Sequence, residues 1–189
     1  KKRIHQIEFF MKYPNEVQEE WLFNLINSAR NTEWGKKYDY KSIESRDEFV
    51  NRVPLQNYDT LKPYIERMLQ GEENILWFSD IKWFAKSSGT TSDKSKFIPV
   101  SNESLEECHY KGGKDLLSIY CNNRPESKIF TGKCLIVGGS NQISPVNDEI
   151  SYGDLSAVLI KNLPIWAEFH TTPNSAIALM EHWEEKLET

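Results

Sequence analysis

Two strand-like segments separated by a loop rich in hydroxyl side chains constrain this chain of 189 residues more than any other feature. Residues 81–86 and 96–100 are mostly apolar, and residues 87–95 between them read SSGTTSDKS. Short apolar runs bounded by Ser, Thr and Gly are typical of strands and their turns. We therefore predict two neighbouring strands joined by this loop.

The loop has the composition of a phosphate-binding loop. Gly89 allows a ligand to approach the backbone closely, and hydroxyl groups donate hydrogen bonds to phosphate oxygens. The segment from Lys82 to Lys96, both included, contains four lysines and one aspartate, in a chain with a formal net charge of -5, so the positive charge is local. Neither G-x-x-x-x-G-K-[ST] nor G-x-G-x-x-G occurs here. Phosphate binding competes with a second interpretation, an ordinary solvated loop.

The loop also resembles the first signature of a known enzyme superfamily. Residues 87–91, a following lysine and the sequence IPVS at 98–101 are similar to the adenylate-forming (luciferase-like) superfamily. Their form is that of the auxin-responsive Gretchen Hagen family of acyl acid amido synthetases. The sequences NTEWGKKY at 31–38, GDLSA at 153–157 and LPIWAEF at 163–169 resemble its bacterial branch.

The resemblance implies an α/β fold and an activity. The chain would be the N-terminal part of an adenylate-forming large domain, with a helical N-terminal region followed by a partial β-sheet flanked by helices. The enzyme would use ATP and Mg²⁺ to adenylate a small carboxylic acid and then form an amide with an amino acid. The implied site consists of a catalytic lysine, Lys96, and of phosphate-binding residues: Ser87, Ser88, Gly89, Thr90 and Thr91.

Two departures from the family pattern qualify these implications. Ser92 and Asp93 intervene before the lysine, so Lys94 is an alternative to Lys96. The family's later motifs, which help to hold magnesium and grip the ribose, do not occur in these residues. The chain is therefore expected to be an N-terminal fragment that is inactive alone and that self-associates through an exposed sheet edge.

Two other functions stay open. An acyl-CoA ligase, or another adenylating enzyme, would carry the same loop because the first half-reaction is shared. A non-catalytic binding module in which the loop holds no nucleotide is the alternative outside enzymes.

Composition indicates a cytoplasmic protein. No apolar run approaches the length of a membrane span, and nothing indicates a nucleic acid polymer as a partner. The three cysteines form no C-x-x-C pair, which favours a reducing compartment over a disulfide framework. Histidines and cysteines lack metal-ligand spacing, so no metal is expected on protein side chains alone.

The order of elements predicts two regions, 1–80 mainly helical and 81–189 an incomplete α/β part of the ATP-binding domain. In the first, residues 16–30 form a helix whose core face consists of Val17, Trp21, Leu25 and Ala29. Ser45 begins a second helix, through a capping box, and Asp59 a third, which ends at Gly71 in the C′ position.

In the second region, Ser101 begins a helix that reaches about Tyr120 and includes Gly112 and Gly113, which indicate close backbone packing. Residues 134–137 are a predicted buried strand. The turn at 138–140, at its carboxyl end, is an ordinary turn or a border of the acyl site. Two further helices begin after Asp154 and Asn174. The aromatic residues near the end are read as core, with an acyl pocket as the alternative: Trp166, Phe169 and Trp183.

Overall fold

The computed structural model describes residues 2–87, 95–136, 143–180 and 184. The chain divides into two compact units. One consists of Lys1–Ile81 with Lys111–Asn122, and the other of Lys82–Tyr110 with Asn123–Thr189.

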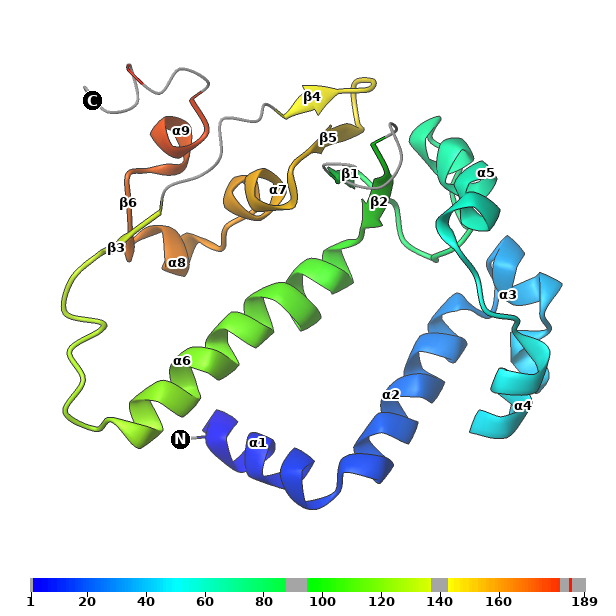
Figure 1. Ribbon diagram of the computed structural model, residues 1–189, viewed down its shortest axis with the longest axis horizontal. Coiled ribbons are helices and arrows are strands. Elements are labelled where there is room, and N and C mark those ends of the chain that lie inside the picture. The colour runs from blue at the N-terminus through cyan, green and yellow to red at the C-terminus, as the bar shows by residue number, and fades with distance from the viewer. Residues whose placement is uncertain (1, 88–94, 137–142, 181–183, 185–189) are drawn as a thin grey trace. The chain divides into compact units, whose positions relative to one another are not determined.

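The first unit is built from helices (Figure 1). They are α1 (Lys2–Lys12), α2 (Pro14–Ala29), α3 (Glu33–Lys37), the short 3₁₀ helix η1 (Tyr40–Ser42), α4 (Arg46–Arg52), α5 (Tyr58–Leu69) and α6 (Lys111–Asn123). One cluster of its core contains five buried residues: Ile26, Ala29, Trp34, Tyr40 and Ile43.

The predicted core face of α2 is wrong in part. Ala29 is buried, but Trp21 and Leu25 are 42% and 50% exposed. The helix carries two apolar stripes, and the one through Leu22, Ile26 and Ala29 faces the core. Both stripes have helical spacing, so periodicity alone could not choose between them.

Caps fix the ends of α4 and α5. The Ser45 hydroxyl accepts a hydrogen bond from the Glu48 N–H (3.2 Å), as predicted, although the Glu48 carboxylate accepts from the Glu44 N–H (2.8 Å). Asn57, and not the predicted Asp59, caps α5 through a reciprocal capping box with Thr60. Asp59 lies inside the first turn, where its charge favours the helix dipole.

Gly71 ends α5 as predicted. Its φ of +94° lies in the left-handed region that glycine adopts without a steric cost. The Gly71 N–H donates to the Met68 carbonyl (3.0 Å), and the Glu72 N–H donates to the Arg67 carbonyl (3.1 Å). These two bonds form a Schellman motif.

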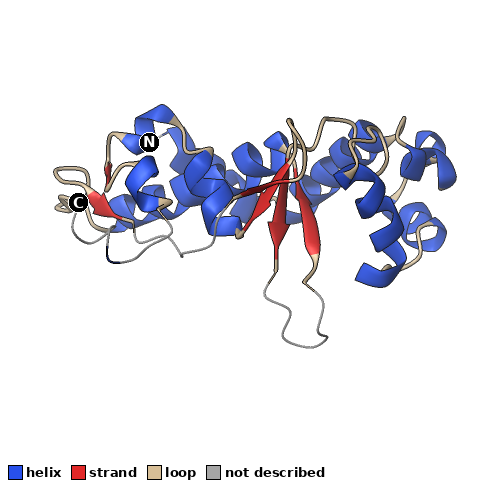
Figure 2. Ribbon diagram, turned by 90° about the horizontal axis from the view of Figure 1, so that it is seen from above, coloured by secondary structure: helices blue, strands red, loops and turns tan. Residues whose placement is uncertain are grey.

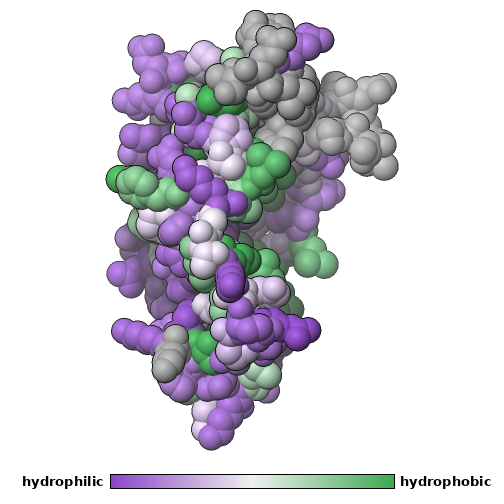
Figure 3. Space-filling model, turned by 90° about the vertical axis from the view of Figure 1, so that its left-hand side faces the viewer, coloured by the Kyte–Doolittle hydropathy of each residue, from purple (hydrophilic) through white to green (hydrophobic). Residues whose placement is uncertain are grey.

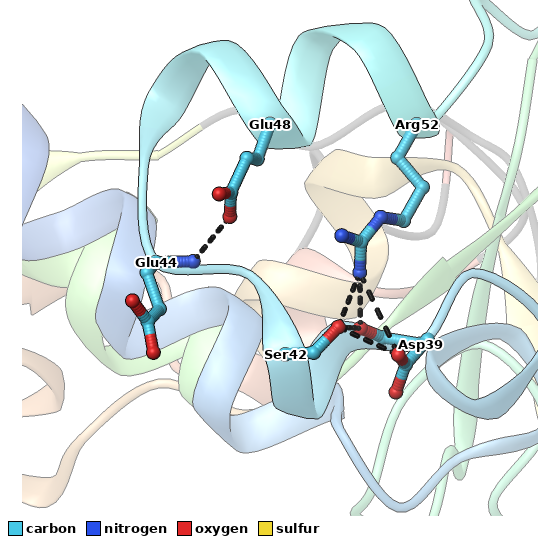
Figure 4. Close-up of polar contacts among 5 residues, drawn as sticks. All are labelled: Asp39, Ser42, Glu44, Glu48 and Arg52. Carbon is cyan, nitrogen blue, oxygen red and sulfur yellow. Dashed lines mark hydrogen bonds and ion pairs between the residues drawn. The ribbon is translucent and has the colours of Figure 1, made fainter.

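A polar cluster holds η1 against α4 (Figure 4). The Arg52 guanidinium donates to the Asp39 carbonyl (2.9 Å) and to the Ser42 hydroxyl (2.6 Å). Asp39 has a φ of +47°, which is uncommon for a residue other than glycine. The bonds from Arg52 stabilise this turn.

The sequence NTEWGKKY forms part of the core of the helical unit. Thr32 is fully buried; its hydroxyl donates to the Ala29 carbonyl (2.7 Å) and accepts from the Gly35 N–H (2.9 Å). Trp34 packs edge-on against Tyr64, with 5.2 Å between ring centroids. Residues 31–38 therefore have a structural role in the first unit.

Charged residues of the same sequence fix α3 to α5. The Lys37 ammonium donates to the Tyr64 hydroxyl (3.0 Å), a bond that raises the pKa of Lys37. Glu33 pairs with Arg67 (2.8 Å), and the hydrogen bond from Arg67 lowers the pKa of Glu33.

The described residues of the second unit form two sheets (Figure 2). The larger has the strand order β2-β1-β5-β4 and the smaller the order β3-β6. Their bounds are β1 (Trp83–Lys86), β2 (Phe97–Val100), β3 (Cys134–Leu135), β4 (Ser144–Pro145), β5 (Ser151–Gly153) and β6 (Thr171–Thr172). The helices of this unit are a π-helix, η2 (Ser104–Tyr110), followed by α7 (Leu155–Lys161), α8 (Ile165–Glu168) and α9 (Ser175–Ala178).

The core of the second unit lies between the larger sheet, η2 and α7. Ala85, Val100, Leu105 and Val158 are buried together. The predicted α/β architecture, with a helical region followed by a partial sheet flanked by helices, is confirmed. Helix starts after Asp154 and Asn174 are confirmed as well, because α7 and α9 begin there.

Three predictions for this region are wrong. Cys134 and Leu135 form a strand, but both are exposed. Within the described residues, β3 pairs only with the two-residue strand β6. Gly112 and Gly113 make no close packing, since a Cβ at either position would meet no described atom within 4 Å. Phe169 is 73% exposed and so does not belong to the core.

Trp166 is also partly exposed, at 46%. Together with Leu135, Ile165 and Phe169 it contributes apolar surface to the second unit. Apolar patches interrupt the polar surface on the face of the molecule in Figure 3. Trp183 and the turn at 138–140 lie outside the described residues.

Candidate phosphate-binding site

The loop predicted to bind phosphate connects the antiparallel strands β1 and β2. The register pairs Lys86 with Phe97 and Trp83 with Val100, which confirms the prediction of two neighbouring strands. The pairing continues one residue further, because the Ser87 N–H donates to the Lys96 carbonyl (2.9 Å). The Lys96 N–H lies 3.4 Å from the Ser87 hydroxyl oxygen, which accepts from it.

Two of the predicted site residues, Ser87 and Lys96, are therefore brought together at the base of the loop. The other predicted members lie outside the described residues: Ser88, Gly89, Thr90, Thr91 and the alternative lysine, Lys94. The structure thus fixes where the loop leaves and rejoins the sheet.

The sheet topology places this base at an edge that suits a ligand. Strand β5 runs parallel to β1, with Phe84 opposite Tyr152 and Ala85 opposite Gly153. The loop follows the carboxyl end of β1, and α7 follows the carboxyl end of β5 after one residue, Asp154. In open α/β sheets, ligands bind outside the carboxyl ends of parallel strands.

Side chains at the base of the loop alternate between the two faces of the sheet. Ser87 and Lys96 follow the face of Ala85, which packs against Val158 of α7. Lys86 belongs to the opposite face, and its ammonium lies 5.4 Å from the centroid of the Tyr152 ring. Phe97 meets the same ring edge-on, at 5.2 Å between centroids.

Sequence reasoning missed the cluster of Lys86, Phe97 and Tyr152. It counted Lys86 among the local charges but gave it no role. Tyr152 lies far away in the sequence, and only the parallel pairing of β1 with β5 brings it beside the loop. The one available signal was the position of Lys86 directly before the first serine of the loop.

The helix after β2 begins as predicted but contains an irregularity. The Ser101 hydroxyl accepts from the Ser104 N–H (3.1 Å), and Ser104–Tyr110 form the π-helix η2 before α6 begins. At its end, the Tyr110 hydroxyl donates to the Leu159 carbonyl (3.0 Å). Burial raises the pKa of Tyr110 to about 12, so this hydroxyl keeps its proton at neutral pH and fastens η2 to α7.

The described residues do not provide a magnesium site. Within residues 2–87, 95–136 and 143–180, no three His, Cys, Asp or Glu side chains lie close enough together to hold a metal ion. Cys108, Cys121 and Cys134 are free thiols. No helix in these ranges is long and apolar enough to cross a bilayer.

The fold is similar to that of two solved structures of acyl acid amido synthetases. The GH3.15 acyl acid amido synthetase superposes with a TM-score of 0.77 at 19% identity, over 97% of this chain and 32% of that one. AtGH3.15 in complex with 2,4-DB gives a TM-score of 0.79 at 16% identity, with the same coverage. At these identities the likeness concerns the fold.

A family model identifies the chain more closely. The model described as "GH3 family N-terminal domain" matches residues 3–189, so the chain belongs to the GH3 family. The indole-3-acetic acid-amido synthetase GH3.2 of Arabidopsis thaliana is 34% identical over 106 residues. The jasmonoyl-L-amino acid synthetase JAR6 of Nicotiana attenuata is 32% identical over 106 residues.

These alignments cover only part of each protein. Each includes 56% of this chain and less than a fifth of the relative, 19% of GH3.2 and 18% of JAR6. The family resemblance seen in the sequence is confirmed by these matches.

Proposed function

We propose that these residues belong to an ATP-dependent acyl acid amido synthetase and form part of its nucleotide-binding domain. The observation that carries the proposal is the hairpin at the carboxyl edge of β1, with Ser87 and Lys96 paired at its base. Family membership supports it, as do relatives whose names describe the joining of an acid to an amino acid.

The proposed reaction has two steps. A carboxylate oxygen of the acid attacks the α-phosphorus of ATP, and the bond to pyrophosphate breaks, which gives an acyl adenylate. An amino acid nitrogen then attacks the acyl carbon and loses a proton to solvent as AMP leaves. ATP is thus a substrate, and the partners are a small carboxylic acid and an amino acid. We place the reaction in the cytoplasm, because the odd number of cysteines favours a reducing compartment.

The loop would act by electrostatics. Negative charge accumulates on the phosphate oxygens as the bond to pyrophosphate breaks, and fixed donors beside a cation lower that barrier. We assign the hydrogen-bond donors to Ser87, Ser88, Thr90 and Thr91. Gly89 would let the phosphates approach the backbone closely, and Lys96 would supply the positive charge. Mg²⁺ would accompany the triphosphate, but no ligand set for it occurs among the described residues, so we assign it no role here.

Pyrophosphate exchange tests the proposal. The full polypeptide that contains these residues should incorporate labelled pyrophosphate into ATP only when a carboxylic acid substrate is present, and the 189 residues alone should not. Lys96→Ala should slow exchange by about a hundredfold or more, the order that one preorganised charge or donor contributes. Lys94→Ala should have a much smaller effect, and Lys133→Ala, at an exposed position beside β3, should have none.

Product analysis then separates the possible acceptors. Mass spectrometry should find an amide when an amino acid is supplied, and no thioester when coenzyme A is supplied. Absence of exchange with every acid in a broad panel would refute adenylation. Equal small effects of the two loop substitutions would refute the assignment of Lys96.

A further inference from the structure

Lys86 carries a positive charge at the base of the loop. Its side chain is exposed and lies at the carboxyl end of β1, directly before Ser87. Among the described residues, no carboxylate lies within ion-pair distance of its ammonium. The Lys86 ammonium lies over the ring of Tyr152, 5.4 Å from its centroid.

The aromatic contact orders this lysine without cancelling its charge. An ammonium over the face of a tyrosine ring is attracted by the ring quadrupole, and the interaction leaves the ammonium's hydrogen-bond donors for other partners. Phe97 packs edge-on against the same ring, so Tyr152 is itself held. A long, flexible side chain is thereby restrained beside the loop.

The sheet explains why these three residues meet. Lys86 and Phe97 are partners in the antiparallel register, and Tyr152 lies on β5, on the other side of β1. The Lys86 side chain and the rings of Phe97 and Tyr152 therefore come together across β1, on the face opposite Ala85 and α7. Ser87 and Lys96 follow the Ala85 face, so the base of the loop carries a lysine on each side of the sheet.

We propose that Lys86 is a second phosphate-binding cation of the nucleotide site and that Tyr152 is its positioning residue. This inference rests on the proposed function, since it requires ATP at the loop. Lys86 would contact phosphate oxygens from the side of the hairpin opposite Lys96. Tyr152 would touch no substrate and would act through Lys86.

The chain contains a matched control for this proposal. Lys82 directly precedes β1 and, four residues before Lys86, belongs to the same face of the strand. Four residues of strand span about 13 Å, which separates Lys82 from the loop. Lys82→Met removes the same charge from the same strand at its other end.

The test measures acid-dependent pyrophosphate exchange by the full polypeptide at varied ATP concentration. Lys86→Met should lower kcat/KM for ATP by about tenfold or more, leave KM for the acid unchanged and leave the melting temperature unchanged. Lys86→Arg should retain most of the activity, because it keeps the charge and the ring contact. Lys82→Met should behave like the wild type.

Two further variants test the positioning role. Tyr152→Phe keeps the ring face and should resemble the wild type. Tyr152→Leu removes it and should lower kcat/KM for ATP about two- to fivefold. Combined with Lys86→Met, Tyr152→Leu should cause no additional loss, because its effect passes through the lysine.

A chemical measurement avoids dependence on folding of the variants. In the wild-type polypeptide, ATP should protect Lys86 from acetylation, with Lys82 as the internal reference in the same mass spectrum. Equal rates of acetylation with and without ATP would overturn the proposal, as would equal kinetics of Lys86→Met and Lys82→Met. A change in KM for the acid alone would assign Lys86 to the carboxylate and overturn it too. Absence of exchange in the wild type would instead refute the proposed function.

Discussion

Replacing Gly35 by alanine sets helix propensity against packing, and the structure predicts that packing decides. Alanine is favoured over glycine by up to about 1 kcal/mol inside a helix, and Gly35 lies in α3. Propensity alone would therefore make Gly35→Ala stabilising. A Cβ at this position, however, would lie 2.1 Å from the carbonyl oxygen of Ala29.

The magnitude follows from the atoms that this Cβ would displace. The neighbours are backbone atoms, at 3.0 Å from the Ala29 carbonyl carbon and the Arg30 Cα, so no flexible side chain can move aside. Overpacking of this kind costs about 1–3 kcal/mol. The same carbonyl accepts from the buried Thr32 hydroxyl, which in turn accepts from the Gly35 N–H, and each lost bond costs about 1 kcal/mol. After the propensity gain, we expect a net destabilisation of about 2–4 kcal/mol.

Gly113→Ala is the matched control. Gly113 lies within α6, and a Cβ there would meet no described atom within 4 Å. The same substitution should therefore stabilise the chain by about 0.5–1 kcal/mol. Urea unfolding of both variants and the wild type, followed by far-ultraviolet circular dichroism, gives the three free energies of unfolding. A Gly35→Ala variant as stable as the wild type, or more stable, would refute the packing argument.

Three further substitutions test other contacts. Asp115→Asn removes a two-bond pair with Arg3 and should lower the free energy of unfolding by about 1 kcal/mol at neutral pH. The pair lowers the pKa of Asp115 from its ordinary value of 3.8. The difference in unfolding free energy between variant and wild type, measured with urea, should therefore persist above pH 4 and vanish as the pH falls through the lowered pKa. Tyr110→Phe removes the donor to the Leu159 carbonyl and should lower the free energy of unfolding by about 1 kcal/mol, with the titration near pH 12 lost from the absorbance spectrum. Asn57→Ala should cost about 1 kcal/mol by removing the cap of α5, and hydrogen exchange should speed up in its first turn.

The sequence predicted the elements whose signals are local. The cap at Ser45, the terminating glycine at Gly71 and the strands on either side of the loop each depend on a few adjacent residues, and all were found. Local signals also explain one error. Asp59 is a good capping residue by type, but Asn57, two residues earlier, makes the box with Thr60.

Features that depend on distant partners could not be predicted in this way. Trp21 and Leu25 follow helical spacing as well as Ile26 does, and only the position of the neighbouring helices decides which stripe is buried. Tyr152 reaches the loop through the parallel pairing of β5 with β1, in which Phe84 and Tyr152 are partners 68 positions apart in the sequence. The assignments of Lys96 and of residues 87–91 remain predictions, as does the self-association of the chain through an exposed sheet edge.

The first unit is built from two segments that are separated in the sequence by part of the second unit, and this order affects folding during synthesis. The helical unit takes residues up to Ile81 and then Lys111–Asn122, so the chain leaves it, makes part of the second unit and returns. Arg3 therefore cannot pair with Asp115 until the 112 residues that follow it, up to Asp115 itself, have been made. Such late, non-local contacts slow folding, and a ribosome that stalls before residue 111 would present a helical unit without α6 and its ion pair.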